Sequence, residues 1–120
     1  MSESNEIDIQ SNGNAVVARI EGTQLGEDLA GTLQTQIAAA AEKAGDLPVL
    51  IDMSRVEFMP SMSIGALVSI WQKFKKVNRR FILVGLQPTV RETLTICRLD
   101  KVFDISDSVE DALSRIRRSS

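Results

Sequence analysis

One stretch of the sequence constrains the fold of this chain most. It is a short apolar run, which leads through a hydroxyl-rich turn into an amphipathic helix. Pro48 to Met53 has the composition of a strand that is covered on both faces of a sheet. From about Ser63 to Val77, apolar residues recur at helical spacing. A helix start offers unpaired N–H groups and the positive end of the helix macrodipole, and both favour an anion. The junction between the two segments therefore suits either a phosphate group or an ordinary helix cap.

The patterns on either side of this junction predict alternating strands and helices. Apolar and polar side chains alternate over residues 7–9, a Ser-Asn-Gly-Asn turn follows at 11–14, and residues 15–20 resume as a strand. This pattern predicts an opening hairpin. Helical spacing and capping signals predict further helices at about 27–45, 88–97 and 108–116, and apolar runs predict strands at 80–84 and 101–105. The order β-β-α-β-α-β-α-β-α indicates an α/β fold, with a mixed, largely parallel β-sheet and helices packed on it.

Length and composition indicate one domain. With 120 residues, 43% of them hydrophobic and 25% charged, the chain has enough material for one ordinary core. We expect a single domain over residues 6–116, with flexible termini at 1–5 and 117–120. The polar N-terminus has no secretory pattern, and no apolar run approaches the roughly 20 residues that span a bilayer. These features predict a cytoplasmic protein without membrane insertion.

Several function classes are disfavoured by what the sequence lacks. There is no histidine, no cysteine pair, no nucleophile elbow and no carboxylate cluster with metal-ligand spacing. We therefore expect no enzyme activity, no metal and no cofactor. A net charge of −2 argues against a nucleic-acid partner. One local basic cluster remains, which is either a solvated helix end or a docking patch: Lys73, Lys75, Lys76, Arg79 and Arg80.

Three single residues have structural predictions. Asp52 follows a strand, where a carboxylate either binds a ligand or, as the pattern favours, stabilises the following turn. Trp71 lies on the apolar stripe of its helix and is expected in the core rather than as an exposed anchor. Cys97, the single cysteine, is expected to be a small buried side chain.

Two segments together resemble the STAS domain family, whose best-known soluble members are bacterial anti-sigma-factor antagonists. The matching residues are Asp52-Met53-Ser54, Val56, Phe58-Met59 and Ile64-Gly65, and further along Pro88, Val90-Arg91, Leu94, Leu99, Val102 and Phe103. The resemblance implies a protein-interaction module that binds an anti-sigma factor of the serine-kinase type. In the family this regulation is called partner switching. Docking of the antagonist on the anti-sigma factor releases a sigma factor for transcription, and phosphorylation of the antagonist reverses that release.

The chain departs from the family pattern at the phosphorylated residue. An ungapped alignment places the phosphorylated Ser or Thr of the family on Met62, its acidic residue on Pro60 and its glycine on Ser63. Methionine cannot accept phosphate, so three hypotheses stay open. In the first, Ser61 or Ser63 is the phosphoacceptor instead. In the second, the switch has been lost and docking is constitutive. In the third, Ser61 or Ser63 only caps the helix, while Met62 fills a gap.

The resemblance also implies where a partner docks. The expected surface is the loop Ser54 to Ser63 with the exposed side of the following helix. An accessory subunit of a lipid-type membrane transporter is an alternative function, and nucleotide sensing at the helix start is a weaker one. The expected contact residues are Ser54, Phe58, Met59, Ser61, Met62 and Ser63, with Phe58 and Met59 as apolar anchors if they are exposed.

Overall fold

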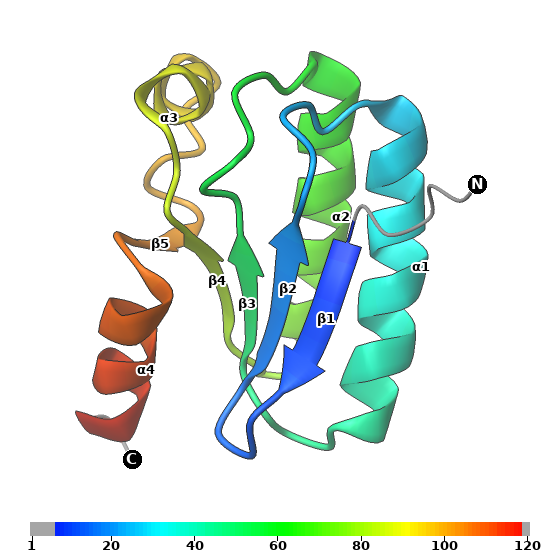
Figure 1. The fold of residues 1–120 in the computed structure, drawn as a ribbon, viewed down its shortest axis with the longest axis vertical. Coiled ribbons are helices and arrows are strands. Elements are labelled where there is room, and N and C mark those ends of the chain that lie inside the picture. Colours follow the sequence, from blue (N-terminus) through cyan, green and yellow to red (C-terminus); the bar gives the residue numbers. More distant parts are fainter. Residues whose placement is uncertain (1–6, 119–120) are drawn as a thin grey trace.

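Five strands and four helices alternate along the described part of the chain (Figure 1). The computed structural model describes residues 7–118, except for the side chain of Glu27. The elements follow the expected order, and the predicted α/β class is confirmed. They are β1 (Ile7–Ser11), β2 (Val16–Ile20), α1 (Glu27–Lys43), β3 (Val49–Asp52), α2 (Ser61–Lys76), β4 (Phe81–Val84), α3 (Pro88–Ile96), β5 (Asp104–Ser106) and α4 (Val109–Arg118).

The strands form one mixed sheet in the order β1-β2-β3-β4-β5. β1 and β2 make the antiparallel hairpin, and every later neighbour is parallel. Val49 of β3 pairs with Val16 on one side and Phe81 on the other, so β3 is the central strand, as its apolar sequence predicts. All three parallel pairs place their carboxyl ends at the same edge, and the loops from that edge carry the candidate site.

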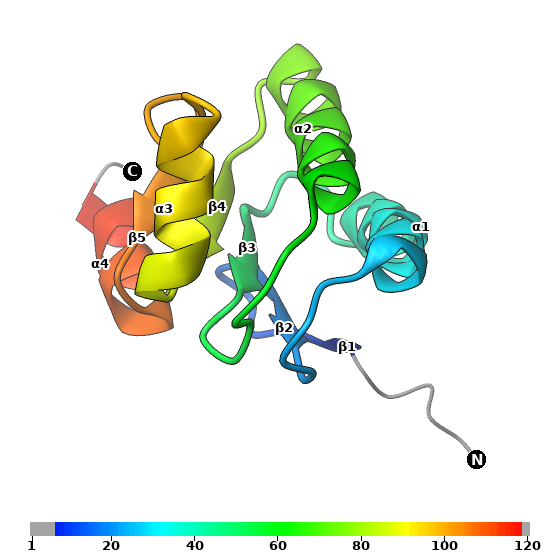
Figure 2. The ribbon, with the colours of Figure 1, turned by 90° about the horizontal axis from the view of Figure 1, so that it is seen from above.

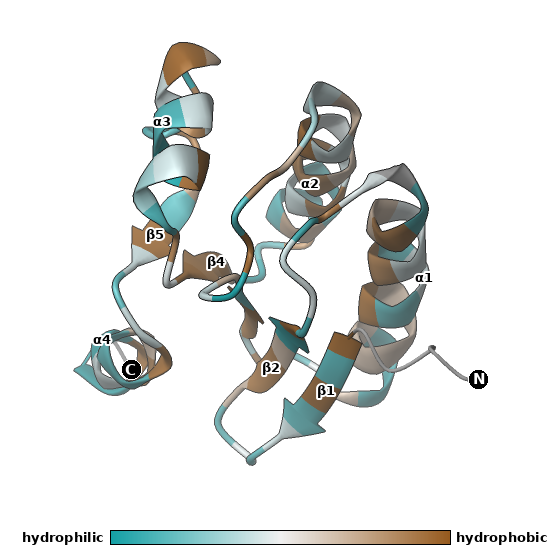
Figure 3. Ribbon diagram, turned by 45° about the horizontal axis from the view of Figure 1, so that its top comes forward, coloured by the Kyte–Doolittle hydropathy of each residue, from teal (hydrophilic) through white to brown (hydrophobic). Residues whose placement is uncertain are grey.

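Helices cover the two faces of the sheet unequally. α1 and α2 lie side by side on one face, and α4 lies on the other (Figure 2). The larger core lies under α1 and α2, where Leu33, Ile37 and Leu67 are almost completely buried. The smaller core joins Leu50 and Ile82 to α4. Bands of alternating hydropathy on β1 show why that strand can leave one face to solvent (Figure 3).

An aromatic cluster ties α2 to the β4 and β5 side of the sheet. Trp71 meets Phe103 edge to face, with ring centroids 6.2 Å apart, and Phe81 packs against both Phe74 and Phe103. Trp71 is partly buried against the larger core, close to its expected place on the apolar stripe. α3 adds Val90 and Leu94 to the same core.

The structure corrects several details of the sequence predictions. Cys97 is exposed rather than buried, because it is the residue at which α3 ends, just before the left-handed Arg98. The last strand begins at Asp104, because the preceding turn returns the amides of Val102 and Phe103 to the carbonyl of Leu99. α4 continues to Arg118, so the C-terminal residues expected to be flexible are partly helical. The expected flexible segment 1–5 and residues 119–120 lie outside the described residues.

Candidate functional site

The loop between β3 and α2 starts with a turn held by Asp52. Its carboxylate oxygen Oδ1 accepts a hydrogen bond from the backbone N–H of Ser54 at 3.0 Å. The N–H of Val56 then donates to the carbonyl of Met53 at 3.0 Å. The predicted turn role of Asp52 is thereby confirmed, since the side chain replaces a backbone acceptor in the usual manner of an Asx turn.

This loop is bound along one side to the loop between β2 and α1. The amides of Glu57 and Phe58 both donate to the carbonyl of Thr23, at 2.7 and 3.2 Å. The carbonyl of Phe58 accepts from the amide of Leu25 at 3.0 Å. These bonds form a short parallel bridge outside the main sheet. The backbone of Phe58 is therefore fixed although its side chain is not buried.

Charged groups reinforce the same side. The Glu21 carboxylate lies between two guanidinium groups, 2.7 Å from Arg55 and 2.9 Å from Arg19. The hydrogen bond that Arg19 donates to Glu21, together with the charge of Glu21, raises the pKa of Arg19 above its ordinary value. Arg55 belongs to the β3–α2 loop, so this pairing joins the loop to the end of β2.

The other side of the loop is bound to the segment that follows β4 and to the first turn of α3. The Gln87 side chain donates to the carbonyl of Ser54 at 2.8 Å, and the Thr89 hydroxyl donates to the carbonyl of Glu57 at 3.0 Å. Gly85 has φ of +72°, and a Cβ atom placed there would lie 3.1 Å from Cβ of Ser54. Glycine at this position allows the two segments to approach each other closely.

Ser63 is a structural residue that joins α2 to the neighbouring loop. Its side chain is fully buried, and its hydroxyl donates to the carbonyl of Leu25 at 2.5 Å. Met59 is also buried, with 4% of its surface exposed. We therefore remove Ser63 from the expected phosphoacceptors and both residues from the expected contact set, because neither side chain reaches the surface of this structure.

The remaining candidates are exposed around the start of α2. Phe58 and Met62 expose 58% and 68% of their surface, which is unusual for large apolar side chains, and Ser54 and Ser61 are exposed as well. We use the name junction surface for Ser54, Phe58, Ser61 and Met62. The exposure of Met62 contradicts the hypothesis that it fills a gap.

The helix start itself has no side-chain cap. Pro60 occupies the N-cap position in an extended conformation, and no side-chain hydrogen bond caps the helix. The prediction that Ser61 or Ser63 caps α2 is therefore wrong: Ser61 is already the first helical residue, and the hydroxyl of Ser63 is used elsewhere. The first turn of α2 also contains no acidic residue.

The junction surface is suited to contact with another molecule. It presents apolar side chains and hydroxyls on a backbone that neighbouring loops hold from both sides. Within the described chain, no three His, Cys, Asp or Glu side chains gather as a potential metal site. Among residues 7–118, no helix has the length and apolar character required to cross a bilayer.

Comparison with known proteins places this arrangement of sheet, helices and loop in an established family of α/β domains. The STAS domain matches residues 6–112, and the chain belongs to the STAS domain family. It is 32% identical over 69 residues to a relative from Thermotoga neapolitana that is named for anti-sigma factor antagonism, covering 58% of this chain and 61% of the relative. The matched part thus spans about three fifths of that relative's length.

Two further likenesses point in the same direction. The chain is 25% identical over 85 residues to BtrV of Bordetella bronchiseptica, also named for anti-sigma factor antagonism, covering 71% of this chain and 72% of BtrV. The crystal structure of a Thermotoga maritima protein of that description superposes with a TM-score of 0.80 at 21% identity, covering 95% of this chain and 97% of that one. This last likeness shows the fold alone.

Proposed function

We propose that this STAS domain is a non-catalytic regulatory module that docks through its junction surface on an anti-sigma factor of the serine-kinase type. The observation that carries the proposal is the exposure of Phe58, on a loop whose backbone is held by hydrogen bonds, and of Met62, in the first turn of the helix that follows. A backbone that is already ordered loses little conformational entropy on binding, so more of the burial of these two side chains remains as affinity. The relatives named for anti-sigma factor antagonism support the choice of partner.

Docking in this proposal is constitutive, because the usual switch residue is absent. Met62 is the second residue of α2, exposes 68% of its surface and lies at the position where the resemblance to the family places the phosphorylated hydroxyl. Of the two serines in the first turn of α2, Ser63 is buried and Ser61 alone is exposed. Control therefore comes from the amount of the protein or of its partner rather than from a phosphate.

The first experiment identifies the partner and compares two exposed positions of α2. The native protein is purified with its bound partner, and both are measured by intact-mass spectrometry. Met62→Asp should weaken binding of that partner by about thirtyfold or more, because removing an interface anchor costs about 2 kcal/mol or more. Gln72→Asp is the matched control, since Gln72 is also exposed on α2 but lies ten residues further along the helix.

The outcomes of this experiment distinguish the alternatives. A kinase-type partner that is lost only with Met62→Asp supports the proposal. A transporter ATPase or permease as the partner would contradict it, and so would an equal loss with Gln72→Asp. A phosphate on Ser61 of the native protein would contradict constitutive docking.

A second experiment restores the hydroxyl group. The variant Met62→Ser is incubated with the purified partner and ATP, next to the wild-type chain. The variant should gain the mass of one phosphate, and the wild-type chain should gain none, because Met62 has no acceptor oxygen. If the variant remains unmodified while it still binds, the serine-kinase assignment of the partner is wrong.

A further inference from the structure

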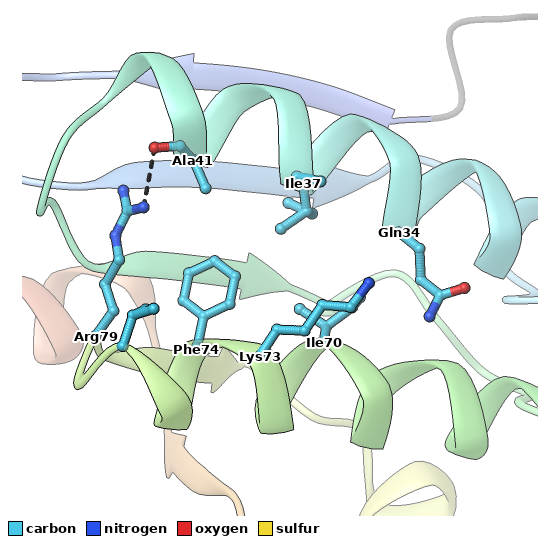
Figure 4. Close-up of a pocket in the computed structure, with 9 residues that line it drawn as sticks. Gln34, Ile37, Ala41, Ile70, Lys73, Phe74 and Arg79 are labelled. Atoms are coloured by element: carbon cyan, nitrogen blue, oxygen red, sulfur yellow. Dashed lines mark hydrogen bonds between the residues drawn. The ribbon is translucent and has the colours of Figure 1, made fainter.

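The C-terminal half of α2 carries a groove that the proposed function does not use. The groove lies between α1 and α2 and has a volume of about 190 Å³ (Figure 4). Ile37 and Ala41 of α1 face Ile70 and Phe74 of α2 across it. The complete lining is Gln34, Ile37, Ala38, Ala41, Ile70, Lys73, Phe74, Val77 and Arg79.

Small side chains on α1 leave this groove open. Ala38 and Ala41 occupy positions where larger residues would fill the space between the helices. On the α2 side, Val77 is 68% exposed at the mouth, next to the buried ring of Phe74. Apolar surface is thus left in contact with water at a point where two helices otherwise pack closely. Such a surface gains free energy when another apolar group covers it.

Positive charge lies beside the groove on α2. Lys73 lines it and Lys76 lies on the next turn, whereas Lys75 is directed over the ring of Trp71, 4.8 Å from the ring centroid. Among residues 7–118, no carboxylate lies within ion-pair distance of these three lysines. Lysines at a helix C-terminus favour the helix macrodipole, but that effect does not require an apolar groove beside them.

Arg79 closes one end of the groove and makes that end rigid. Its Nε donates to the carbonyl of Leu47 at 2.8 Å, and its Nη1 donates to the carbonyl of Ala41 at 2.9 Å (Figure 4). The guanidinium carbon also lies 5.4 Å from the centre of the Phe74 ring. The predicted basic cluster therefore divides into the structural Arg79, the half-buried Arg80 just before β4, and three exposed lysines, Lys73, Lys75 and Lys76.

The size and charge of the groove indicate its occupant. A cavity of about 150 Å³ holds a benzene ring, whereas pockets for drug-sized ligands measure about 300–1,000 Å³. The groove is therefore suited to a single large side chain and is small for a whole metabolite. The lysines favour carboxylates next to that side chain. A flat lipid surface would not fill a concave groove of this kind.

We propose that the groove between α1 and α2 is a docking site for an acidic polypeptide segment that inserts one apolar side chain between Ala38 and Val77 and pairs its carboxylates with Lys73 and Lys76. This site lies at the end of α2 opposite the junction surface. Met62 and Val77 are fifteen residues apart, which is about 22 Å along a helix. Two polypeptides can therefore bind the domain at the same time, and the proposal does not depend on what the junction surface binds.

The test uses a short helical peptide with leucine on one face and glutamate on the other. It is titrated into the isotope-labelled protein, and amide chemical shifts are followed by NMR. We expect salt-sensitive binding, with the largest shifts at Ala38, Lys73 and Val77 and none at the junction surface. A peptide in which lysine replaces glutamate should not bind. Absence of binding by the acidic peptide at millimolar concentration would overturn the proposal.

Matched variants separate the groove from general electrostatics. Ala38→Phe fills the groove and should weaken binding at least about tenfold, whereas Ala39→Phe adds the same ring at an adjacent exposed position outside the groove and should not. Reversing Lys73 and Lys76 to glutamate should have an effect of similar size, and reversing Arg117 and Arg118 on α4 should not. The site would be refuted if Ala39→Phe weakened peptide binding as much as Ala38→Phe does. It would also be refuted if the arginine reversals weakened binding as much as the lysine reversals do. Binding to anionic phospholipid vesicles without peptide binding would instead identify a membrane surface.

Discussion

The two ends of α2 share one helix but are built on different principles. At its N-terminal end, the preceding loop is held by backbone hydrogen bonds to Thr23 and by the side chains of Gln87 and Thr89, and the first turn carries no acidic residue. At its C-terminal end, three lysines and an apolar groove face solvent. One end presents apolar groups on a fixed backbone, and the other combines a hollow with charge.

This difference teaches that a single helix can offer two surfaces that select different partners. A surface of apolar and hydroxyl side chains depends on close fit, so it is sensitive to a carboxylate introduced at Met62. A charged groove depends on complementary charge, so it is sensitive to salt and to charge reversal. Both surfaces depend on internal contacts that hold the helix ends in place, and those contacts can be tested without any partner.

The largest expected effect lies at the C-terminal end. Arg79→Met removes two hydrogen bonds from a charged donor and leaves the carbonyls of Ala41 and Leu47 without that donor. We expect the free energy of unfolding to fall by about 3 kcal/mol. Part of the loss is offset, because the substitution also removes the buried Nη2 group, which has no hydrogen-bond partner within the described residues. Urea denaturation measures the change. Lys76→Met, at an exposed position, should change it by less than about 0.5 kcal/mol.

The next effect lies at the N-terminal end. Ser63→Ala leaves the carbonyl of Leu25 without its hydroxyl donor in a buried site. The free energy of unfolding should fall by about 2 kcal/mol, because a buried acceptor that loses its partner keeps its desolvation penalty. Ser61→Ala, on the exposed side of the same turn, should be within about 0.5 kcal/mol of the wild type. Equal effects of the two substitutions in thermal or urea unfolding would contradict the assigned role of Ser63.

Part of this site could be predicted from the sequence, because it depends on local pattern. The order of strands and helices and the turn at Asp52 follow from short stretches of chain. The burial of Ser63 also had a signal that was missed. It lies four residues before Leu67 and seven before Ile70, so it continues the buried side of the helix.

The rest depends on contacts between distant segments. Ser63 and its acceptor Leu25 are 38 positions apart, and Thr89 and Glu57 are 32 apart. No local periodicity encodes such pairs. Met59 and Phe58 are neighbours with opposite environments, and only the bridge to the loop of Thr23 determines which of the two is buried. The groove likewise requires knowing that Ala38 of α1 and Val77 at the end of α2 line the same space.

A smaller effect tests the close approach beside the junction surface. Gly85→Ala must keep a φ of +72° and brings a methyl group to 3.1 Å from the side chain of Ser54. We expect a loss of about 1–2 kcal/mol in the free energy of unfolding. Gly31→Ala is the control, since Gly31 lies within α1 with no atom within 4 Å of an added Cβ, and it should not destabilise the protein. A neutral Gly85→Ala would mean that the two segments separate easily.

The smallest expected effect tests how firmly the N-terminal end of α2 is held. Gly65 is an exposed residue inside α2, and an added Cβ meets nothing within 4 Å. Gly65→Ala should raise the free energy of unfolding by about 0.5–1 kcal/mol, because alanine lowers the entropy of the unfolded chain. Gln72→Ala, towards the other end, replaces one good helix former by another and should change stability less. Hydrogen exchange should slow in the first turns of α2 with Gly65→Ala. If it slows equally at both ends, the two ends are coupled through the helix rather than held separately by their own contacts.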